Sequence, residues 1–398
     1  MQSSRLSLFL FLAAAVVTAQ STTPTSKQSP APPVWQLEDS GVTASLRGID
    51  SVDGHVAWAS GTDGTVLKTT DRGAHWQKCS VPDAGTDGAT LDFRGVQAWD
   101  SATAIVMASG PGKKSRLYKT VDGCSTWTLL YENPDSPDGF FDSFWLNGFY
   151  GQGILLGDPV KGSFTVFETE DGGQTWKRDA RKGLSLHGHS LAAFAASNSS
   201  IARSTDKYIA GFVTGGKSGA VLYERWTPPH FAKLPSLHLK RGEAAGPEWT
   251  TTNLPLAQGS DAAGAFSLGY RVLESSATEI FHKGGAANYV NDWRFVAVGG
   301  DYTKPNDSKG TAAWSEDDGK HWTASDAAPH GYRSSVQWSA DLKLWITAGT
   351  NGSDVSRDEG RTWQPLDNGN WNALSLPFVV GPKGRIAYLN PDVLPKTN

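Results

Sequence analysis

A pattern of apolar and polar positions recurs along this chain about every 40–50 residues. Each repeat has an apolar first segment, a second apolar segment, a Gly-rich connection, a short third segment and then a polar turn. Short apolar segments bounded by Gly-rich turns predict β-strands rather than helices. The predicted first strands are Ala44–Ile49, Thr90–Trp99, Phe141–Phe149, Ser190–Ala196, Ala265–Val272, Gly331–Trp338 and Trp371–Val380.

The polar turn has the form S/T-x-D-x-G-x-x-W in five repeats, as in Thr169 to Trp176. The Asp can accept hydrogen bonds from the amides of its own turn, and the Gly tolerates positive φ. The Trp begins the next strand and supplies a large apolar surface for packing between repeats. We therefore predict a structural role for Asp71, Gly73, Trp76, Asp122, Trp127, Asp171, Gly173, Trp176, Asp317, Gly319, Trp322, Asp358, Gly360 and Trp363.

Two independent features each occur seven times. The Gly-rich connections are one, and the other is a series of Trp residues that includes Trp35 and Trp249. The spacing suits the four-stranded blades of a β-propeller, with insertions at about 227–247 and 273–292. We predict an all-β, seven-bladed propeller with four-stranded blades in a domain of residues 34–398.

The two ends of the repeat region complement each other. The last repeat ends after its third strand, at Arg385–Tyr388, and Val34–Leu37 precedes the first repeat as an isolated Trp strand. Pairing these two segments would remove the open edge of the array. The sequence therefore predicts a ring closed by its N-terminal strand.

The N-terminal residues suggest export. Residues 1–19 combine Arg5, an apolar run and a small-residue cleavage site, which is typical of a signal peptide. Residues 20–33 are rich in Ser, Thr, Pro and Gln and predict a disordered spacer. We expect a periplasmic or secreted monomer without a membrane span. The net charge of −4 gives no reason to expect nucleic acid as a partner.

Cys79 and Cys124 are the chain's two cysteines. Export permits a disulfide, but Cys79 falls in a predicted strand and Cys124 in the turn of the next repeat. Buried free thiols are the favoured interpretation, and a disulfide is the alternative. Two cysteines cannot form a structural zinc site by themselves, and we expect neither a metal nor a cofactor.

The polar turns resemble the Asp-box (BNR-type) repeats of sialidases, sortilin-like receptors and other propellers. A narrower set of motifs comprises Ser45-Leu-Arg-Gly-Ile49, Asp92-Phe-Arg-Gly-Val96, Gly157-Asp-Pro159, Gly299-Gly-Asp301 and Gly331-Tyr-Arg-Ser334. Together with the seven repeats and the export signal, these motifs resemble the photosystem II stability/assembly factor-like family. The resemblance implies a protein-binding or assembly scaffold.

A polar site is predicted where the inner strands begin. Arg47, Arg94 and Arg333 are aligned in one register, because each lies at the start of a predicted inner strand. Inner strands line the central channel of a propeller, so these side chains should converge at one mouth. The full predicted mouth is Arg47, Arg94, Asp142, Asp158, Asp301, Tyr302, Arg333 and Asn372.

Two interpretations of this mouth remain open. Its arginines could bind an acidic segment or a carboxylate of a protein partner through forked hydrogen bonds. They could instead pair with Asp residues of neighbouring blades and simply close the ring.

We expect an exported, non-catalytic binding or assembly scaffold. The alternative is a sialidase-like glycoside hydrolase or a carbohydrate-binding propeller, since the three arginines could imitate a sialidase triad. The Arg-Ile-Pro motif of sialidases is absent, as are a Gly-x-Ser-x-Gly elbow and a phosphate-binding Gly loop.

Overall fold

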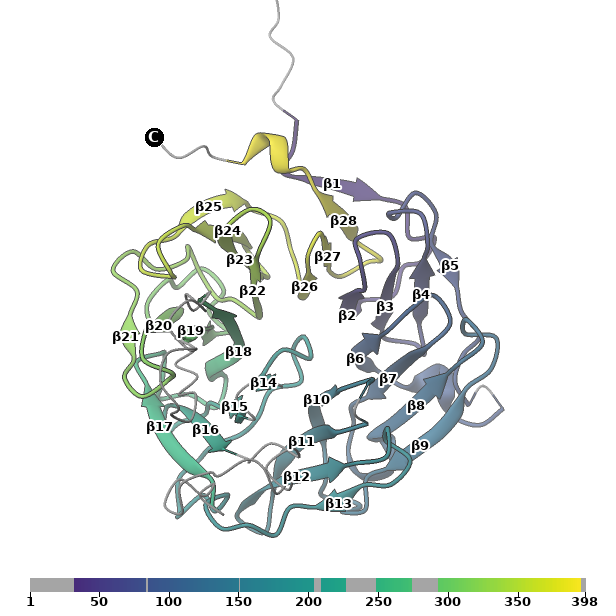
Figure 1. Cartoon of the computed structure of the whole chain (residues 1–398), viewed down its shortest axis with the longest axis horizontal. Coiled ribbons are helices and arrows are strands. Elements are labelled where there is room, and N and C mark those ends of the chain that lie inside the picture. Colours follow the sequence, from purple (N-terminus) through teal and green to yellow (C-terminus); the bar gives the residue numbers. More distant parts are fainter. Residues whose placement is uncertain are drawn as a thin grey trace, which may run out of the picture. The chain divides into compact units, whose positions relative to one another are not determined.

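The computed structural model describes residues 32–83, 85–149, 151–203, 209–226, 248–273 and 293–394. The predicted signal peptide, nearly all of the spacer and almost all of both insertions lie outside these ranges. The described residues from 33 onward form one compact unit. In it, seven four-stranded antiparallel sheets are arranged as a ring of blades (Figure 1).

The first three blades follow one another along the chain, each from the inner to the outer strand. Blade 1 contains β2 (Leu46–Ser51), β3 (Ala57–Gly61), β4 (Val66–Thr69) and β5 (Gln77–Lys78). Blade 2 contains β6 (Phe93–Ala98), β7 (Ala104–Ala108), β8 (Arg116–Thr120) and β9 (Thr128–Glu132). Blade 3 contains β10 (Phe141–Leu146), β11 (Gly153–Val160), β12 (Ser163–Thr169) and β13 (Lys177–Arg178).

Blades 4 to 6 have the same order. Blade 4 contains β14 (Ile201–Arg203), β15 (Ile209–Val213), β16 (Ala220–Trp226) and β17 (Thr250–Leu254). Blade 5 contains β18 (Ala263–Val272), β19 (Trp293–Asp301), β20 (Ala312–Ser315) and β21 (Thr323–Ala324). Blade 6 contains β22 (Ser335–Ser339), β23 (Leu344–Gly349), β24 (Gly352–Ser356) and β25 (Gln364–Asp367). Short 3₁₀ turns occupy η1 (Gly88–Thr90), η2 (Gly112–Lys114) and η5 (Pro391–Val393).

Blade 7 closes the ring in the way that the sequence predicts. It combines β26 (Ala373–Ser375), β27 (Phe378–Val380) and β28 (Ile386–Leu389) with the N-terminal β1 (Trp35–Glu38). β1 pairs antiparallel with β28, with Trp35 opposite Leu389 and Glu38 opposite Ile386. Closure therefore joins the two ends of the propeller through backbone hydrogen bonds.

The hydrophobic core lies between the blades. The described residues form seven buried clusters, and each cluster joins two neighbouring blades. Side chains near the channel add polar ties: Asp50 accepts a hydrogen bond from the Ala98 amide at 2.7 Å, and Gln97 donates to the Leu146 carbonyl at 2.7 Å. Each blade is thus stabilised mainly by its neighbours.

The Asp turns stabilise themselves locally. Asp171 accepts hydrogen bonds from the Thr175 amide at 2.9 Å and the Thr175 hydroxyl at 2.6 Å. The hydroxyl contact, followed by the amide contact, lowers the pKa of Asp171 to about 2. Gly173 has φ +86°, a left-handed conformation that favours glycine.

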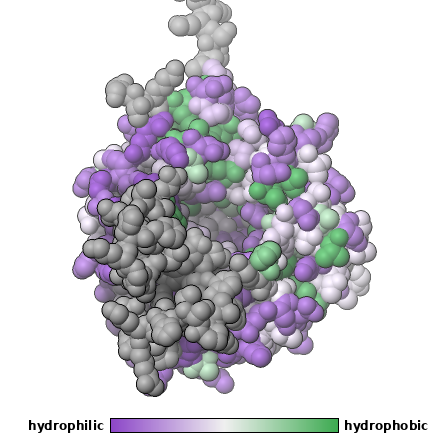
Figure 2. Space-filling model, viewed as in Figure 1, coloured by the Kyte–Doolittle hydropathy of each residue, from purple (hydrophilic) through white to green (hydrophobic). Residues whose placement is uncertain are grey.

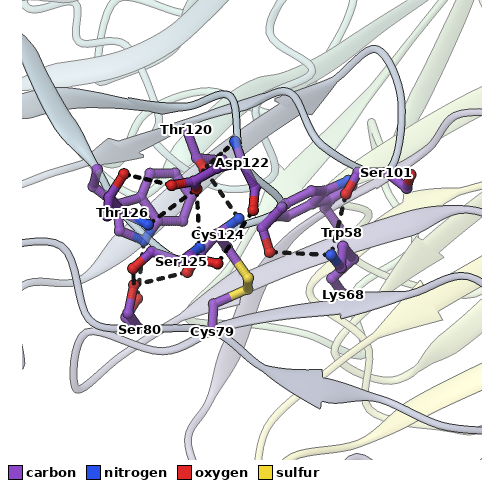
Figure 3. The surroundings of a disulfide bond; sticks show 12 residues. Trp58, Lys68, Cys79, Ser80, Ser101, Thr120, Asp122, Cys124, Ser125 and Thr126 are labelled. Atoms are coloured by element: carbon purple, nitrogen blue, oxygen red, sulfur yellow. Dashed lines mark hydrogen bonds between the residues drawn. A yellow bond between two sulfur atoms is a disulfide. The ribbon is translucent and has the colours of Figure 1, made fainter.

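The cysteines form a disulfide, contrary to the favoured interpretation. Cys79 follows β5 of blade 1 and is bonded to Cys124 in the Asp turn of blade 2, with 5.3 Å between their Cα atoms (Figure 3). Both residues are buried. The hydroxyl of Ser80 also donates to the Cys124 carbonyl at 2.7 Å. The two motif positions differ in sequence but meet because the outer strand of one blade runs beside the turn of the next.

The predicted fourth inner strand, Ser190–Ala196, is wrong. Its alternating small and apolar residues resemble a strand, but it forms only an isolated bridge between Ala192 and Gly215, which lies beyond the end of β15. The inner strand proper is β14, where Ile201 pairs with Phe212. The intervening chain leaves the sheet and crosses the channel, and in Figure 1 the teal segment beside β14 reaches into the centre of the ring.

We call residues 193–200 the channel plug because they contact blades on several sides. Ser197 donates a hydrogen bond to the Ser334 carbonyl in blade 6 at 2.8 Å. Asn198 accepts one from the Phe144 amide in blade 3 at 2.8 Å. A Cβ placed on Gly95 of blade 2 would lie 3.0 Å from the Asn198 side chain. The plug therefore divides the channel into two halves.

Candidate functional site

The candidate site begins with a one-residue bulge in the inner strands. The register between β2 and β3 shifts between Leu46 and Gly48, which leaves Arg47 as the extra residue. The same shift occurs around Arg94 in β6 and around Asp142 in β10. Bulges redirect side chains and commonly occur beside functional sites. The bulges place these three side chains at one end of the channel, which we call the arginine mouth.

Two arginines of the mouth share one carboxylate. Arg94 Nε donates a hydrogen bond to Asp92 Oδ2 at 2.8 Å, and Arg47 Nε lies 3.5 Å from Asp92 Oδ1. The side chains of Arg47 and Arg94 are 33% and 31% exposed. Two guanidinium groups of neighbouring blades thus face the carboxylate of Asp92. Asp92 thus joins two blades, while both arginine side chains stay partly exposed.

Two acidic groups in blade 3 lie next to this pair. Asp142 is 1% exposed, and burial, followed by the nearby charge of Asp158, raises its pKa well above the usual range, with Arg94 opposing. Burial also raises the pKa of Asp158 to about 6, although its carboxylate accepts a hydrogen bond from the Ala193 amide at 3.1 Å. Asp142 is therefore a weaker counter-ion for the arginines than an exposed Asp would be.

A cluster of aromatic residues surrounds Phe194, near the start of the plug. Phe194 of the plug stacks on Phe266 with 3.9 Å between ring centroids. Tyr302 and Tyr332 both meet Phe266 edge-on, at 6.1 and 4.8 Å. The side chain of Tyr302 is 51% exposed, unlike the buried ring of Tyr332.

Asp301 and Asn372, two further predicted residues of the mouth, form hydrogen bonds within the ring. Asp301 is 7% exposed and accepts a hydrogen bond from the Thr303 amide at 3.0 Å. Asn372 Nδ2 donates to the Leu46 carbonyl at 2.7 Å and so connects blade 7 to blade 1. Both residues shape the mouth rather than offering free polar groups.

Arg333 is not in the register that the sequence predicts. A Cβ on Gly349 would approach the Cα of Arg333, just as one on Gly61 would approach the Cα of Leu46. Arg333 therefore occupies the buried position of Leu46, one residue before that of Arg47, and it is 0% exposed. Its guanidinium forms an ion pair with the buried Asp354 of the same blade. A slip of one residue moves a side chain to the opposite face of a strand.

Several residues of the mouth escaped sequence reasoning. Asp92 lies two residues before Arg94, inside a motif that was noted only for its arginine. Phe266 occupies the bulge of β18, where the register shifts between Ala265 and Ser267. Phe194 could not be placed because the fourth inner strand was misassigned. Looking for the residue at the bulge position of each inner strand would have found Phe266.

The described residues contain no group of three or more His, Cys, Asp or Glu side chains that could hold a metal ion. The described part of the chain also has no helix long and apolar enough to cross a membrane.

Replacing the buried acid Asp142 should reveal its charge state. In the unfolded chain an Asp ionises near pH 4, whereas the folded pKa is raised, so wild-type stability falls as pH increases from about 4 toward the folded pKa. Asp142→Asn removes this penalty. We expect its denaturant midpoint to exceed that of the wild type at neutral pH, with the difference shrinking as pH approaches 4.

Asp171→Asn should show the opposite pH dependence of the denaturant midpoint. Its folded pKa is lowered to about 2, so its stabilising contribution is present above its unfolded pKa and is lost as pH falls toward 2. Its midpoint should be below that of the wild type at neutral pH and converge with it in acid. Equal pH dependence in all three proteins would contradict both assignments.

The fold and its mouth define a closed, seven-bladed β-propeller with a polar site at one end of a plugged channel. Among solved structures, a similar one is YCF48 from Cyanidioschyzon merolae, with a TM-score of 0.55, 16% sequence identity, and coverage of 90% of this chain and 99% of that chain. Another is YCF48 bound to D1 peptide, with a TM-score of 0.54, 16% identity, and coverage of 90% and 98%. Identity at this level shows a common fold.

Comparison of the sequence with known families and proteins found no match. No family model matches the chain, and no curated protein matches it.

Proposed function

We propose that this protein is an exported, non-catalytic propeller that binds an acidic segment or terminal carboxylate of a partner protein at the arginine mouth. The observation that carries the proposal is the sharing of Asp92 by Arg47 and Arg94, both about one-third exposed. An incoming carboxylate can accept forked hydrogen bonds from these guanidinium groups. Tyr302, which follows β19 of blade 5, adds an exposed aromatic side chain.

The similarity in fold supports a peptide as the kind of partner. One propeller of similar fold was solved as YCF48 bound to D1 peptide. The motifs around Arg47 and Arg94 also resemble those of photosystem assembly factor-like proteins. A role in assembling or stabilising a partner outside the cytoplasm is consistent with both and with the sequence of residues 1–19.

The mouth offers less support for a glycosidase. Such enzymes use two carboxyl groups that flank the scissile bond, so both must reach the substrate. Asp142 is almost completely buried, and Asp158 already accepts a hydrogen bond from the Ala193 amide. In addition, Arg333 is buried, which removes the third arginine of a sialidase-like triad.

A peptide-binding measurement tests the proposal. The probe is a short peptide of Asp and Glu with a free C-terminus, and the matched probe contains Asn and Gln and is amidated. We expect the acidic peptide to bind the wild type more tightly, and Arg47→Ala/Arg94→Ala to weaken it by about tenfold or more, since hydrogen bonds between charged groups are lost. Binding should also weaken as salt is added.

Arg178→Ala/Arg361→Ala is the control, because both side chains are exposed arginines on the outer part of the ring with single acidic partners. This variant should bind like the wild type. Equal loss in both double variants would reduce the effect to net charge and overturn the proposed site. Turnover of an aryl glycoside by the wild type that disappears in Arg47→Ala/Arg94→Ala would overturn the non-catalytic assignment.

A further inference from the structure

A second site lies in the other half of the channel. The space between the plug and the ends of the inner strands is a cavity of about 550 Å³, and Figure 2 shows the ring hollowed at its centre. Ser197, Asn198 and Ser199 of the plug form part of its lining. The apolar wall comes from six different inner strands and consists of Ile49, Val96, Phe144, Ile201, Val336 and Leu374.

Asp50 stands out in this lining. It is the one titratable side chain among the described residues that line the cavity. Its Oδ2 accepts the hydrogen bond from the Ala98 amide, and no described side chain forms an ion pair with the carboxylate. Burial raises the pKa of Asp50 to about 6, which this amide partly offsets. The cavity wall therefore carries one carboxyl group that has no counter-ion among the described residues.

The polar side chains of the cavity wall at Gln97, Gln337 and Ser375 already form hydrogen bonds within the protein. Gln97 both donates to the Leu146 carbonyl and accepts from the Leu146 amide, and Gln337 accepts from the Leu376 amide. Ser375 accepts from the Ser51 amide at 2.9 Å. Asp50 Oδ1 differs, since it accepts no hydrogen bond from any described residue and can receive one from a ligand.

The indole groups of Trp99 and Trp145 also line the cavity. Aromatic rings attract cations, most strongly when water is excluded, and small-molecule sites are mostly apolar with a few well-placed polar groups. Buried charges in proteins are usually paired. An alkylammonium ion satisfies all three features, because its chain contacts the apolar wall and its charge pairs with Asp50.

We infer that this cavity, which we call the Asp50 cavity, binds an alkylammonium group, either of a free amine or of a lysyl side chain. The ammonium donates to Asp50 Oδ1, and the alkyl chain packs between the inner strands. The cavity is separated from the arginine mouth by the plug and selects the opposite charge. The inference therefore does not rest on the proposed function.

Calorimetric titration with three probes tests this site. Pentylammonium represents a free amine, Nα-acetyl-lysine methylamide represents a lysyl side chain, and 1-pentanol is the uncharged counterpart. We expect at least one of the two cations to bind the wild type, and pentanol to bind at least tenfold more weakly. Which cation binds distinguishes the two sources of the group.

Asp50→Asn is the matching variant, because the amide oxygen keeps the hydrogen bond from Ala98 while the charge is removed. It should lower cation affinity by about tenfold or more and leave pentanol unaffected. Asp53→Asn is its control, since Asp53 lies in the following loop, outside the cavity lining, and accepts hydrogen bonds from the His55 and Val56 amides. This control should bind the cations like the wild type.

Three results would overturn the inference. One is equal affinity of the wild type for pentanol and both cations, and another is unchanged cation binding in Asp50→Asn. The third is an absence of binding by either cation up to ~10 mM, a concentration at which even very weak specific sites are occupied. The pentanol comparison uses only the wild type, so it remains decisive if Asp50→Asn fails to fold.

Discussion

Replacing Trp176 with Ala is expected to lower the free energy of unfolding by about 3–5 kcal/mol, the range for deleting a large buried aromatic side chain. Trp176 is 8% exposed and belongs to a cluster that joins blades 2 and 3. Its ring lies 6.1 Å from that of Tyr131 in blade 2, and its Nε1 donates to the Gly173 carbonyl at 3.0 Å. Removal therefore opens a cavity at a blade junction and leaves a turn carbonyl without its partner.

Trp127→Ala provides the matched comparison. Trp127 occupies the same place in the Asp turn of blade 2, but it is only partly buried and its Nε1 bond to the Ser80 carbonyl is exposed. We expect a clearly smaller loss of stability for this variant. Denaturant unfolding curves for both variants and the wild type are the measurement. Similar losses at both positions would mean that burial does not determine the contribution of these Trp residues.

The ring could be predicted because its signals are local and repeated. A turn such as Thr169 to Trp176 contains its own hydrogen-bond acceptors and its glycine, so its conformation depends little on distant residues. Repetition then fixes the number of blades. Closure followed from the missing last strand, and the pairing of Trp35 with Leu389 confirms it with a shift of one residue along β28.

The failures arose where neighbouring blades decide the structure. The segment Leu191–Ala195, which leads into the plug, has a strand-like pattern. The course of the plug is nevertheless determined by contacts with Ser334, Phe144 and Phe266 on other blades. The disulfide likewise depends on how the outer strand of blade 1 lies beside the next turn. Such contacts join residues that are far apart in sequence, so the local pattern of apolar and polar residues cannot predict them.

The prediction of the arginine mouth was correct for two arginines and wrong for the third. Arg47 and Arg94 each precede a Gly in a bulged strand, so their alignment is correct. Arg333 precedes Ser334 in a similar motif, but the approach of Gly349 aligns Arg333 with Leu46 rather than with Arg47. The motif alone therefore does not determine which face of the strand the arginine occupies.

Replacing Arg333 with Ala should therefore affect stability rather than binding. Arg333 and Asp354 are both 0% exposed, and Asp354 Oδ1 also faces His330 Nδ1 at 2.7 Å. Removing the arginine leaves a buried carboxylate without its main counter-ion, which typically costs about 3–5 kcal/mol. We expect the denaturant midpoint of Arg333→Ala to fall accordingly. The folded fraction of this variant should bind the acidic peptide with wild-type affinity.

The double replacement Arg333→Met/Asp354→Leu separates charge from packing. Exchanging a whole buried ion pair for apolar residues of similar volume is often neutral or stabilising. This variant should regain most of the stability lost in Arg333→Ala and should keep peptide affinity, because Arg47 and Arg94 are unchanged. If peptide binding is lost in the stable double variant, Arg333 contributes to the site despite its burial. If Arg333→Ala unfolds like the wild type, the buried pair with Asp354 does not hold blade 6 together.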